Sequence, residues 1–300
     1  MIMTDRKILY TKISKYLISI LRFVLIFGLC YVILKPIIQY FLYACMSPED
    51  FGDYTVSNIP KNWSLFYWKK AAELLDMFGA AGLRSFIFSV SIALLQMCSS
   101  MVIGYGMARF KFRGKGFLNV MLFIVMLVPA TVLQLPQYFQ FRFFGVGALQ
   151  VNLINTLWPY YILSATGLGL KQALYIFLMK SLFEQMPTDM ENAAYIDGAG
   201  VFRTFTAVVV PNAKALMITI FLFAFCWTWT DSSFATAFYP DVPLASSTLL
   251  SLDSMLNSTG TTAGNVTYAG MIMVMVPMLI LMVFCQKHLV KSIALSGMAN

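Results

Sequence analysis

Long apolar blocks are the feature that most constrains this 300-residue chain. Each block is about 20 residues long, the length at which a helix crosses a hydrocarbon core roughly 30 Å thick. Hydrophobic residues make up 59% of the chain and charged residues only 11%, whereas about 25% of the residues in a typical soluble domain are charged. So few charges cannot cover a water-exposed surface. The pattern therefore predicts an all-α polytopic membrane protein.

The blocks predict six transmembrane helices in a single domain over residues 1–300. Their approximate ranges are 17–44, 83–108, 117–139, 155–183, 212–231 and 267–286. The first block is too long for the core of a signal peptide, so we expect it to be a retained span. Basic residues gather before the first span, between the second and third, around the loop after the fourth, and after the sixth. Positively charged loops remain cytoplasmic, so both termini are expected in the cytoplasm.

Several classes of function do not fit this sequence. The net charge of +8 is spread over the ends of the spans, so the membrane explains it and nucleic-acid binding does not. His288 is the only histidine, which excludes triads and zinc motifs that need this residue type within a cluster. The phosphate-binding pattern G-x-x-x-x-G-K-[S/T] does not occur. We therefore expect a protein that is not an enzyme and binds no cofactor.

Lys171 is an unusual charge inside a predicted span. A continuous helix over 155–183 would place it near mid-membrane, at a cost of roughly 2.5–3.5 kcal/mol. The preceding Thr166-Gly167-Leu168-Gly169 would weaken that helix, and interrupted helices in transporters occur where the backbone lines a cavity. The sequence is equally compatible with a Lys171 that faces a cavity and one at the outer surface.

Polar and aromatic residues near the outer ends of the spans suggest a pathway for a solute. The amides of the third and fourth spans can hydrogen-bond saccharide hydroxyls. The aromatic residues that close the fifth span fit either an interfacial belt or rings that stack on a sugar beside a carboxylate. The candidates are Gln134, Gln137, Asn152, Asn155, Lys171, Trp227, Trp229 and Asp231.

The loop after the fourth span, about residues 184–211, contains several local signals for helices and turns. Thr188 and Glu191 match the S/T-x-x-E pattern of a capping box, and Gly198 and Gly200 favour a tight turn. Pro211 suits the first turn of a following helix. The pattern predicts a short helix, a turn and a second helix at the cytoplasmic surface. At this point a docking element for a partner and a purely structural turn both remain open.

This loop closely resembles the cytoplasmic loop of binding-protein-dependent ABC importer permeases. That pattern is E-A-A, three residues, G, nine residues and I-x-L-P. It falls on Asn192-Ala193-Ala194, then Gly198, then Val208, Val210 and Pro211 with its spacing intact, and Asn192 replaces the usual glutamate. In that family the loop inserts into a cleft of the ATPase subunit. The resemblance implies as coupling residues Glu191, Asn192, Ala193, Ala194, Asp197, Gly198, Ala199 and Pro211.

Other stretches resemble the carbohydrate branch of the family and its smaller, six-span subunit. They include Tyr105–Gly114 at the end of the second span and Ile59–Asn62. The resemblance implies a type I importer permease fold in a multi-pass subunit of the bacterial cell membrane. The implied partners are a second, different permease, two ATPase subunits, membrane lipid and an extracytoplasmic solute-binding protein.

By alternating access, such a subunit would pass a sugar or oligosaccharide into the cytoplasm. A permease of the same family for another solute and a secondary transporter are the alternatives. A secondary transporter would show paired charges or inverted repeats at mid-membrane, and Lys171 has no charged partner within a predicted span. An intramembrane enzyme would need clustered reactive side chains, which the spans lack.

Overall fold

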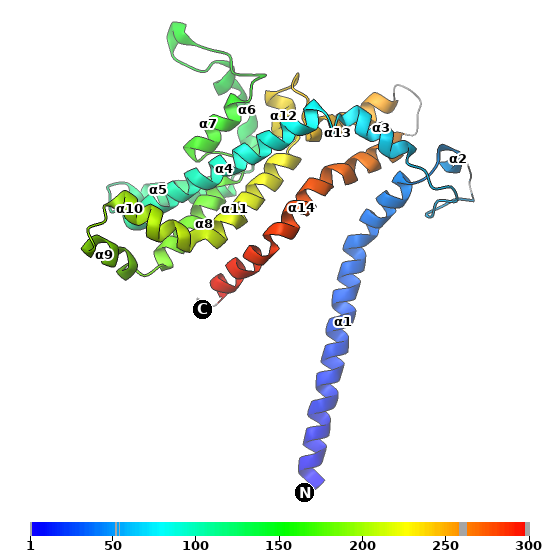
Figure 1. Cartoon of the computed structure of the whole chain (residues 1–300), viewed down its shortest axis with the longest axis horizontal. Coiled ribbons are helices and arrows are strands. Elements are labelled where there is room, and N and C mark those ends of the chain that lie inside the picture. The colour runs from blue at the N-terminus through cyan, green and yellow to red at the C-terminus, as the bar shows by residue number, and fades with distance from the viewer. Residues whose placement is uncertain (1, 52, 54, 258–262, 298–300) are drawn as a thin grey trace. The chain divides into compact units, whose positions relative to one another are not determined.

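The computed structural model describes residues 2–51, 53, 55–257 and 263–297, which form helices and no β-sheet (Figure 1). Two units can be distinguished. One is Met1–Ala71 with Leu256–Ile272, and the other is Ala72–Met255 with Met273–Asn300. The all-helical class is therefore confirmed, and the single domain over residues 1–300 stays a prediction.

The first unit contains the first predicted span. Its elements are α1 (Ile2–Ala44), α2 (Pro48–Phe51), the beginning of α3 (Phe66–Leu75) and the beginning of α14 (Ala263–Gly297). The carboxylate of Asp50 fixes the loop between α2 and α3, since it accepts hydrogen bonds from the backbone N–H groups of Lys61 and Asn62, each at 2.9 Å. The Ile59–Asn62 stretch is therefore ordered by a buried acid.

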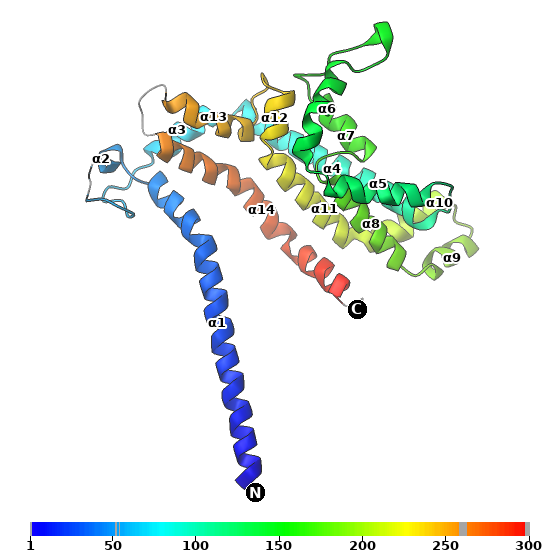
Figure 2. The same ribbon diagram turned by 180° about the vertical axis from the view of Figure 1, so that it is seen from behind.

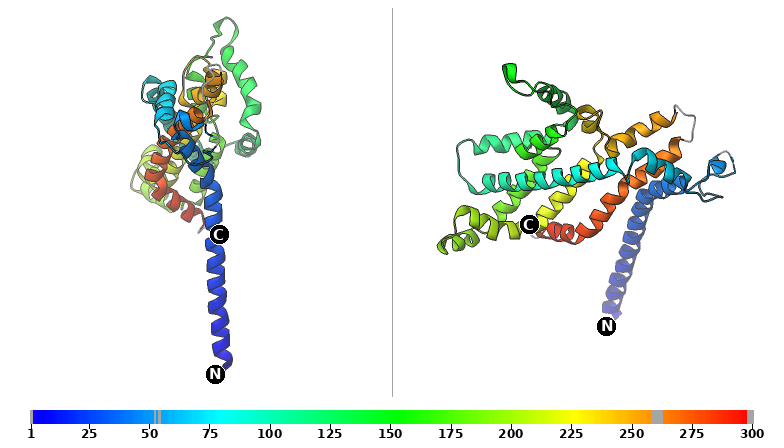
Figure 3. Two further views of the ribbon diagram at one scale, coloured as in Figure 1. Left: turned by 90° about the vertical axis from the view of Figure 1, so that its right-hand side faces the viewer. Right: turned by 45° about the horizontal axis from the view of Figure 1, so that its top comes forward.

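The second unit holds most of the remaining helices. They are α4 (Ala80–Arg109), α5 (Lys115–Leu127), α6 (Ala130–Arg142), η1 (Gly147–Leu149), α7 (Trp158–Thr166), α8 (Gln172–Gln185), α9 (Asp189–Ile196), α10 (Val201–Thr204), the π-helix η2 (Phe205–Val209), α11 (Val210–Thr230), α12 (Ser233–Phe238) and α13 (Ala245–Asn257). Helices α4, α8 and α11 lie side by side (Figures 1 and 3). Helices α9 and α10 lie at one end of this unit, away from α12 and α13 (Figure 2).

Two apolar clusters form the core of the second unit. The larger one joins α4, α8 and α11 through residues such as Met101, Tyr175, Met179 and Phe225. The smaller one joins α4, α6, α7 and α12 and contains Phe88, Phe141, Tyr160, Phe238 and Tyr239. Its rings meet mostly edge to face, as between Phe88 and Tyr160 with centroids 5.3 Å apart, the geometry that aromatic quadrupoles favour.

Among the described residues, four helices are long and apolar enough to cross a membrane. They are Lys15–Ala44, Ala80–Arg109, Val201–Thr230 and Gly264–Lys287, and they contain the predicted spans 17–44, 83–108, 267–286 and all of 212–231 except its last residue. The fifth of the six predictions began too late in the chain, because α10, η2 and α11 form one helix from Val201. Pro211 lies in the first turn of α11, as predicted, but the chain before it is already helical through α10 and the π-turn.

The other two predicted spans are each divided into two helices, and their role as spans stays a prediction. Residues 117–139 divide into α5 and α6, which bend by 107° at Val128-Pro129. Pro129 has no N–H to continue the hydrogen-bond ladder of α5. Residues 155–183 divide into α7 and α8 around Gly167–Lys171. The interruption anticipated at Thr166–Gly169 is confirmed.

Gly104 allows α4 and α8 to pack closely. A methyl group at this position would lie 2.7 Å from Cβ of Met179 and 3.0 Å from the backbone nitrogen of Lys180, both on α8. Small residues at such crossings let helix backbones approach each other within a membrane. The hydrophobic effect does not drive helices together inside lipid, so this close packing contributes to the stability of the unit.

We predict that Gly104→Ala lowers the thermal stability of the detergent-solubilised protein. Overpacking of this kind costs about 1–3 kcal/mol. Gly106→Ala is the matched control, since a methyl group on Gly106 meets no atom within 4 Å and alanine favours a helix by up to about 1 kcal/mol. Equal melting temperatures for the two variants would contradict the packing role of Gly104.

Candidate functional site

The loop predicted to couple to an ATPase is tied to the end of α4 by a buried carboxylate. Glu191, on α9, is only 6% exposed. Its Oε1 accepts a hydrogen bond from Nε of Arg109 at 2.7 Å, and its Oε2 accepts one from the hydroxyl of Tyr105 at 2.9 Å. Nη2 of Arg109 also donates to the carbonyl of Met186 at 2.8 Å. We call Tyr105, Arg109 and Glu191 the loop clamp.

The loop clamp changes how the S/T-x-x-E pattern is interpreted. Helix α9 begins at Asp189 with Thr188 at its N-cap, as predicted, but the side chain of Thr188 makes no capping hydrogen bond. Glu191 turns toward α4, where a guanidinium offers a charge-assisted bond roughly twice as strong as a neutral one. The start of the helix was correctly predicted, and the capping box was wrong.

Only one of the two glycines predicted to form the turn after α9 has a conformation that requires glycine. Gly198 has φ +82°, in the left-handed region that favours glycine. Gly200 has φ −74° and ψ 167°, which any residue adopts. Beyond the turn, the ring of Phe205 in η2 lies 4.7 Å from the ring of Tyr105. Loop, π-turn and α4 therefore meet at the loop clamp.

The opposite side of α9 and α10 is open and apolar. Ile196 is 86% exposed and Phe202 is 79% exposed, and Met190 and Tyr195 are also exposed. Among the small residues of the motif, Ala193 is exposed, and Ala194 and Ala199 are half-buried. Asn192, Asp197 and Gly198 lie on the exposed side as well, and Pro211 is exposed further along the chain. We call Met190, Ile196 and Phe202 the loop face; Tyr195, one turn after Glu191, is exposed but lies on the side that faces Tyr105.

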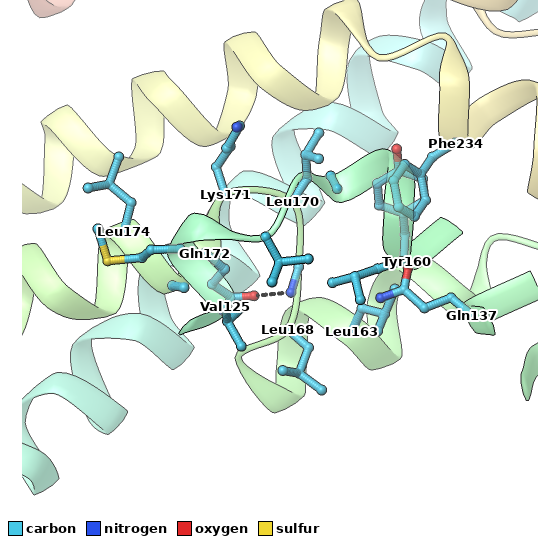
Figure 4. Close-up of a pocket in the computed structure, with 16 residues that line it drawn as sticks. Val125, Gln137, Tyr160, Leu163, Leu168, Leu170, Lys171, Gln172, Leu174 and Phe234 are labelled. Atoms are coloured by element: carbon cyan, nitrogen blue, oxygen red, sulfur yellow. Dashed lines mark hydrogen bonds between the residues drawn. The ribbon is translucent and has the colours of Figure 1, made fainter. Parts of the chain in front are cut away.

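The two helix interruptions line one cavity of about 190 Å³ within the second unit. Val125, Met126 and Val128 come from the α5–α6 bend, and Leu168–Leu174 come from the α7–α8 break. Tyr160, Gln137 and Phe234 lie toward the other end of the cavity from Lys171 and Gln172 (Figure 4). The expectation that irregular backbone accompanies a cavity is met here.

Buried amides hold the α7–α8 break in place. Nε2 of Gln172 donates to Oγ of Ser99 at 2.6 Å and to the carbonyl of Ser164 at 2.8 Å. The backbone N–H of Gly169 donates to Oε1 of Gln172 at 2.8 Å (Figure 4), and Gln96 donates to Oγ of Ser164. Backbone groups inside a membrane have no water to bind, so Gln172 satisfies groups that the break would leave unpaired.

Lys171 lies at this break with φ +58° and lines the cavity. Its ammonium lies over the ring of Trp227, 5.1 Å from the centroid, within the range of a cation–π contact. Of the two interpretations of Lys171, the structure supports the one that places it at a cavity. Gln137 lines the same cavity, so three of the eight pathway candidates come together: Gln137, Lys171 and Trp227.

Two further pathway candidates, Trp229 and Asp231, make hydrogen bonds within the protein. Trp229 is 2% exposed, and its indole N–H donates to the carbonyl of Val274 at 2.8 Å. It is a core residue, neither a belt at an interface nor a free stacking surface. Asp231 accepts hydrogen bonds from the hydroxyl of Tyr160 and from the backbone of Phe234, so its carboxylate is already engaged.

The three amides outside the cavity also bind within the chain. Gln134 donates to the carbonyl of Ser233 at 2.8 Å. Asn152 caps the backbone N–H of Ile154, and Asn155 donates to Asp241 at 2.7 Å. These contacts order the connection between α6 and α7 and its contact with the segment after α12.

Sequence reasoning missed three residues of the cavity and the inward role of the loop clamp. Tyr160, Gln172 and Phe234 are ordinary residues of apolar stretches, and the sequence marks none of them as a site. The loop clamp did leave a signal. Tyr105 and Arg109 are four residues apart and so lie on one face of a helix, at the end of a span where a buried carboxylate would meet both.

Comparison with known proteins identifies the family. Residues 100–295 match the model of the binding-protein-dependent transport system inner membrane component. The chain belongs to this family. It is thus a multi-pass membrane permease of a binding-protein-dependent transport system, and the predicted family is confirmed.

The relatives and a solved structure agree with this assignment. The chain is 26% identical to the maltodextrin transport system permease protein MdxG of Bacillus subtilis, over 71% of this chain and 73% of the relative. It is 24% identical to the maltodextrin permease protein MalD of Streptococcus pneumoniae, over 95% and 97% of the two chains. It shares its fold (TM-score 0.70, 19% identity, 91% and 97% coverage) with a chain of a bacterial ABC transporter involved in alginate import.

We predict that Glu191→Ala detaches α9 from α4. Removing one partner of a buried ion pair costs about 3–5 kcal/mol, and here the loss is confined to a loop at the end of the unit. Limited proteolysis in detergent should cleave the 184–200 segment much faster in the variant. Asp189→Ala is the matched control, because this acid lies exposed on the same helix. Equal cleavage rates would show that the loop clamp does not hold the loop.

Proposed function

We propose that this permease passes a saccharide across the bacterial cell membrane as one of two different permease subunits, driven by two ATPase subunits that dock on its 184–211 loop. In this proposal the chain crosses the membrane six times with both termini in the cytoplasm, and the interrupted segments 117–139 and 155–183 count as spans. ATP and Mg²⁺ belong to the ATPases, and an extracytoplasmic binding protein delivers the solute.

The loop is the observation that carries the proposal. The loop clamp fixes the inner side of α9, while the loop face presents three apolar side chains to the exterior. Exposed apolar patches on a polar element are typical of protein–protein contacts. A rigid helical protrusion with an apolar surface suits a cleft in a partner. The family resemblance implies that this cleft belongs to the ATPase.

The loop clamp also bears on the replacement of the family's glutamate by Asn192. Glu191 is buried and engaged, so it does not replace that charge on the exposed side. Docking in this chain therefore rests on apolar contact and on the Asn192 amide more than on an ion pair. The relatives that transport maltodextrin and arabinooligosaccharides support a saccharide as the solute.

We predict that the 184–211 loop is cytoplasmic. A cysteine replacing the exposed Tyr195 should resist a membrane-impermeant maleimide in whole cells and react in inverted vesicles. The experiment needs a background in which the exposed native Cys30 and Cys98 are replaced by serine. Labelling of intact cells would overturn the proposed orientation.

We predict that Ile196→Asp abolishes copurification of the ATPase while the permease pair still forms. A charge buried without a partner in a close interface costs several kcal/mol. Leu149→Asp is the matched control, since Leu149 is 83% exposed on η1, outside the 184–211 loop. A normal yield of ATPase with the Ile196 variant would refute docking through the loop face.

A further inference from the structure

The cavity at the two helix interruptions contains one charge and no counter-charge. Of the 16 residues that line it, Lys171 is the only one that is ionised. In the described part of the chain, no carboxylate forms an ion pair with its ammonium, and its assigned contact is the Trp227 ring. Asp231, one helical turn beyond Trp227, is engaged with Tyr160. The cavity therefore has a net positive charge.

A second polar group in this cavity also lacks a partner. Oε1 of Gln137 is buried and has no hydrogen-bond partner among the described residues. A buried acceptor without a partner costs about 1–3 kcal/mol. This cost falls when a ligand supplies a hydroxyl for Gln137, and an anionic group on the same ligand would give Lys171 its counter-charge.

The backbone conformation that holds Lys171 at this position is strained. A non-glycine residue in the left-handed region is under strain of order 1–3 kcal/mol, and such strain gathers at functional sites. The amide network of Gln172 secures the conformation. The N-terminus of the 14-residue helix α8 begins at the next residue, and the dipole of a helix favours negative charge at that end.

Resting on the proposed function, we propose that the solute is an anionic saccharide and that Lys171 binds its carboxylate or phosphate group as it passes. Gln137 would receive a hydroxyl of the same sugar unit, and the rings of Tyr160 and Phe234 supply apolar surface beside it. The cavity of about 190 Å³ is smaller than the roughly 300–1,000 Å³ of typical ligand pockets. It suits one sugar unit at a time rather than a whole oligosaccharide.

The test uses the purified transporter with both permeases and its ATPases in lipid nanodiscs, without the binding protein. Calorimetry measures three probes, namely trigalacturonate, its carboxyl-reduced neutral counterpart, and glucose 6-phosphate. The unmodified transporter should bind at least one anionic probe more tightly than the neutral trisaccharide. Which anion binds better distinguishes a uronate from a sugar phosphate as the natural group.

Lys171→Gln should weaken binding of the preferred anion about tenfold to hundredfold, the loss expected for a charge-assisted bond, and leave the neutral probe unchanged. Lys171→Arg should retain the affinity within about threefold. Lys180→Gln is the matched control, since Lys180 lies on α8, the helix that follows Lys171, pairs with Glu184 at 3.1 Å and does not line the cavity.

Several outcomes would overturn the inference. These are no binding of either anion by the unmodified transporter, or an equal effect of Lys171→Gln on charged and neutral probes. Loss of the second permease from the Lys171→Gln complex would also overturn it, because Lys171 would then pair with a carboxylate of that subunit. Failure of the proposed function is distinguishable, since ATPase and second permease would then be missing from the unmodified preparation.

Discussion

The second unit depends on how the chain satisfies its backbone where helices are interrupted. An unpaired N–H or C=O inside a membrane has no water to bind and costs several kcal/mol. At the α7–α8 break the carboxamide of Gln172 accepts from the N–H of Gly169 and donates to the carbonyl of Ser164. One side chain thus supplies the partners that a continuous helix would have supplied. The break can therefore exist, and with it the cavity and the position of Lys171.

The loop clamp solves a similar problem at the C-terminal end of α4. Arg109 and Glu191 are both largely buried, and neither charge is tolerable there without the other. Their pairing fixes which side of α9 faces the bundle. Consequently Ile196 and Phe202 must face outward, where they gain nothing for the isolated chain and present an apolar surface to a partner.

A single helix connects these two regions. Residues Val201–Thr230 are continuous through α10, the π-turn and α11. The helix begins beside α9, where Phe205 contacts Tyr105, and ends near Trp227, which lies under the ammonium of Lys171. The π-turn directly precedes Pro211, which has no N–H for the ladder. Such π-turns inside helices frequently accompany functional sites.

The sequence by itself determined the class, the location and the family of this protein. Apolar blocks of about 20 residues admit only helices in lipid, and the spacing from Asn192 to Pro211 identifies the permease loop. The interruption at Thr166–Gly169 could be predicted because the conformational freedom of glycine weakens a helix locally. The start of α9 and the turn at Gly198 could also be predicted, because they too depend on local sequence signals. Each of these features depends on residues close together in the chain.

Only the tertiary structure decided which side chains meet. Glu191 and Arg109 are 82 residues apart, so a local pattern favoured a capping box that the remote guanidinium displaced. Trp227 and Trp229 look equivalent in the sequence, yet helical rotation buries Trp229 in the core and leaves Trp227 half-exposed beneath Lys171. Gln172 and Tyr160 gain their roles from packing against α4 and α12. Contacts between distant segments follow from how the helices pack, and no single residue of the sequence predicts them.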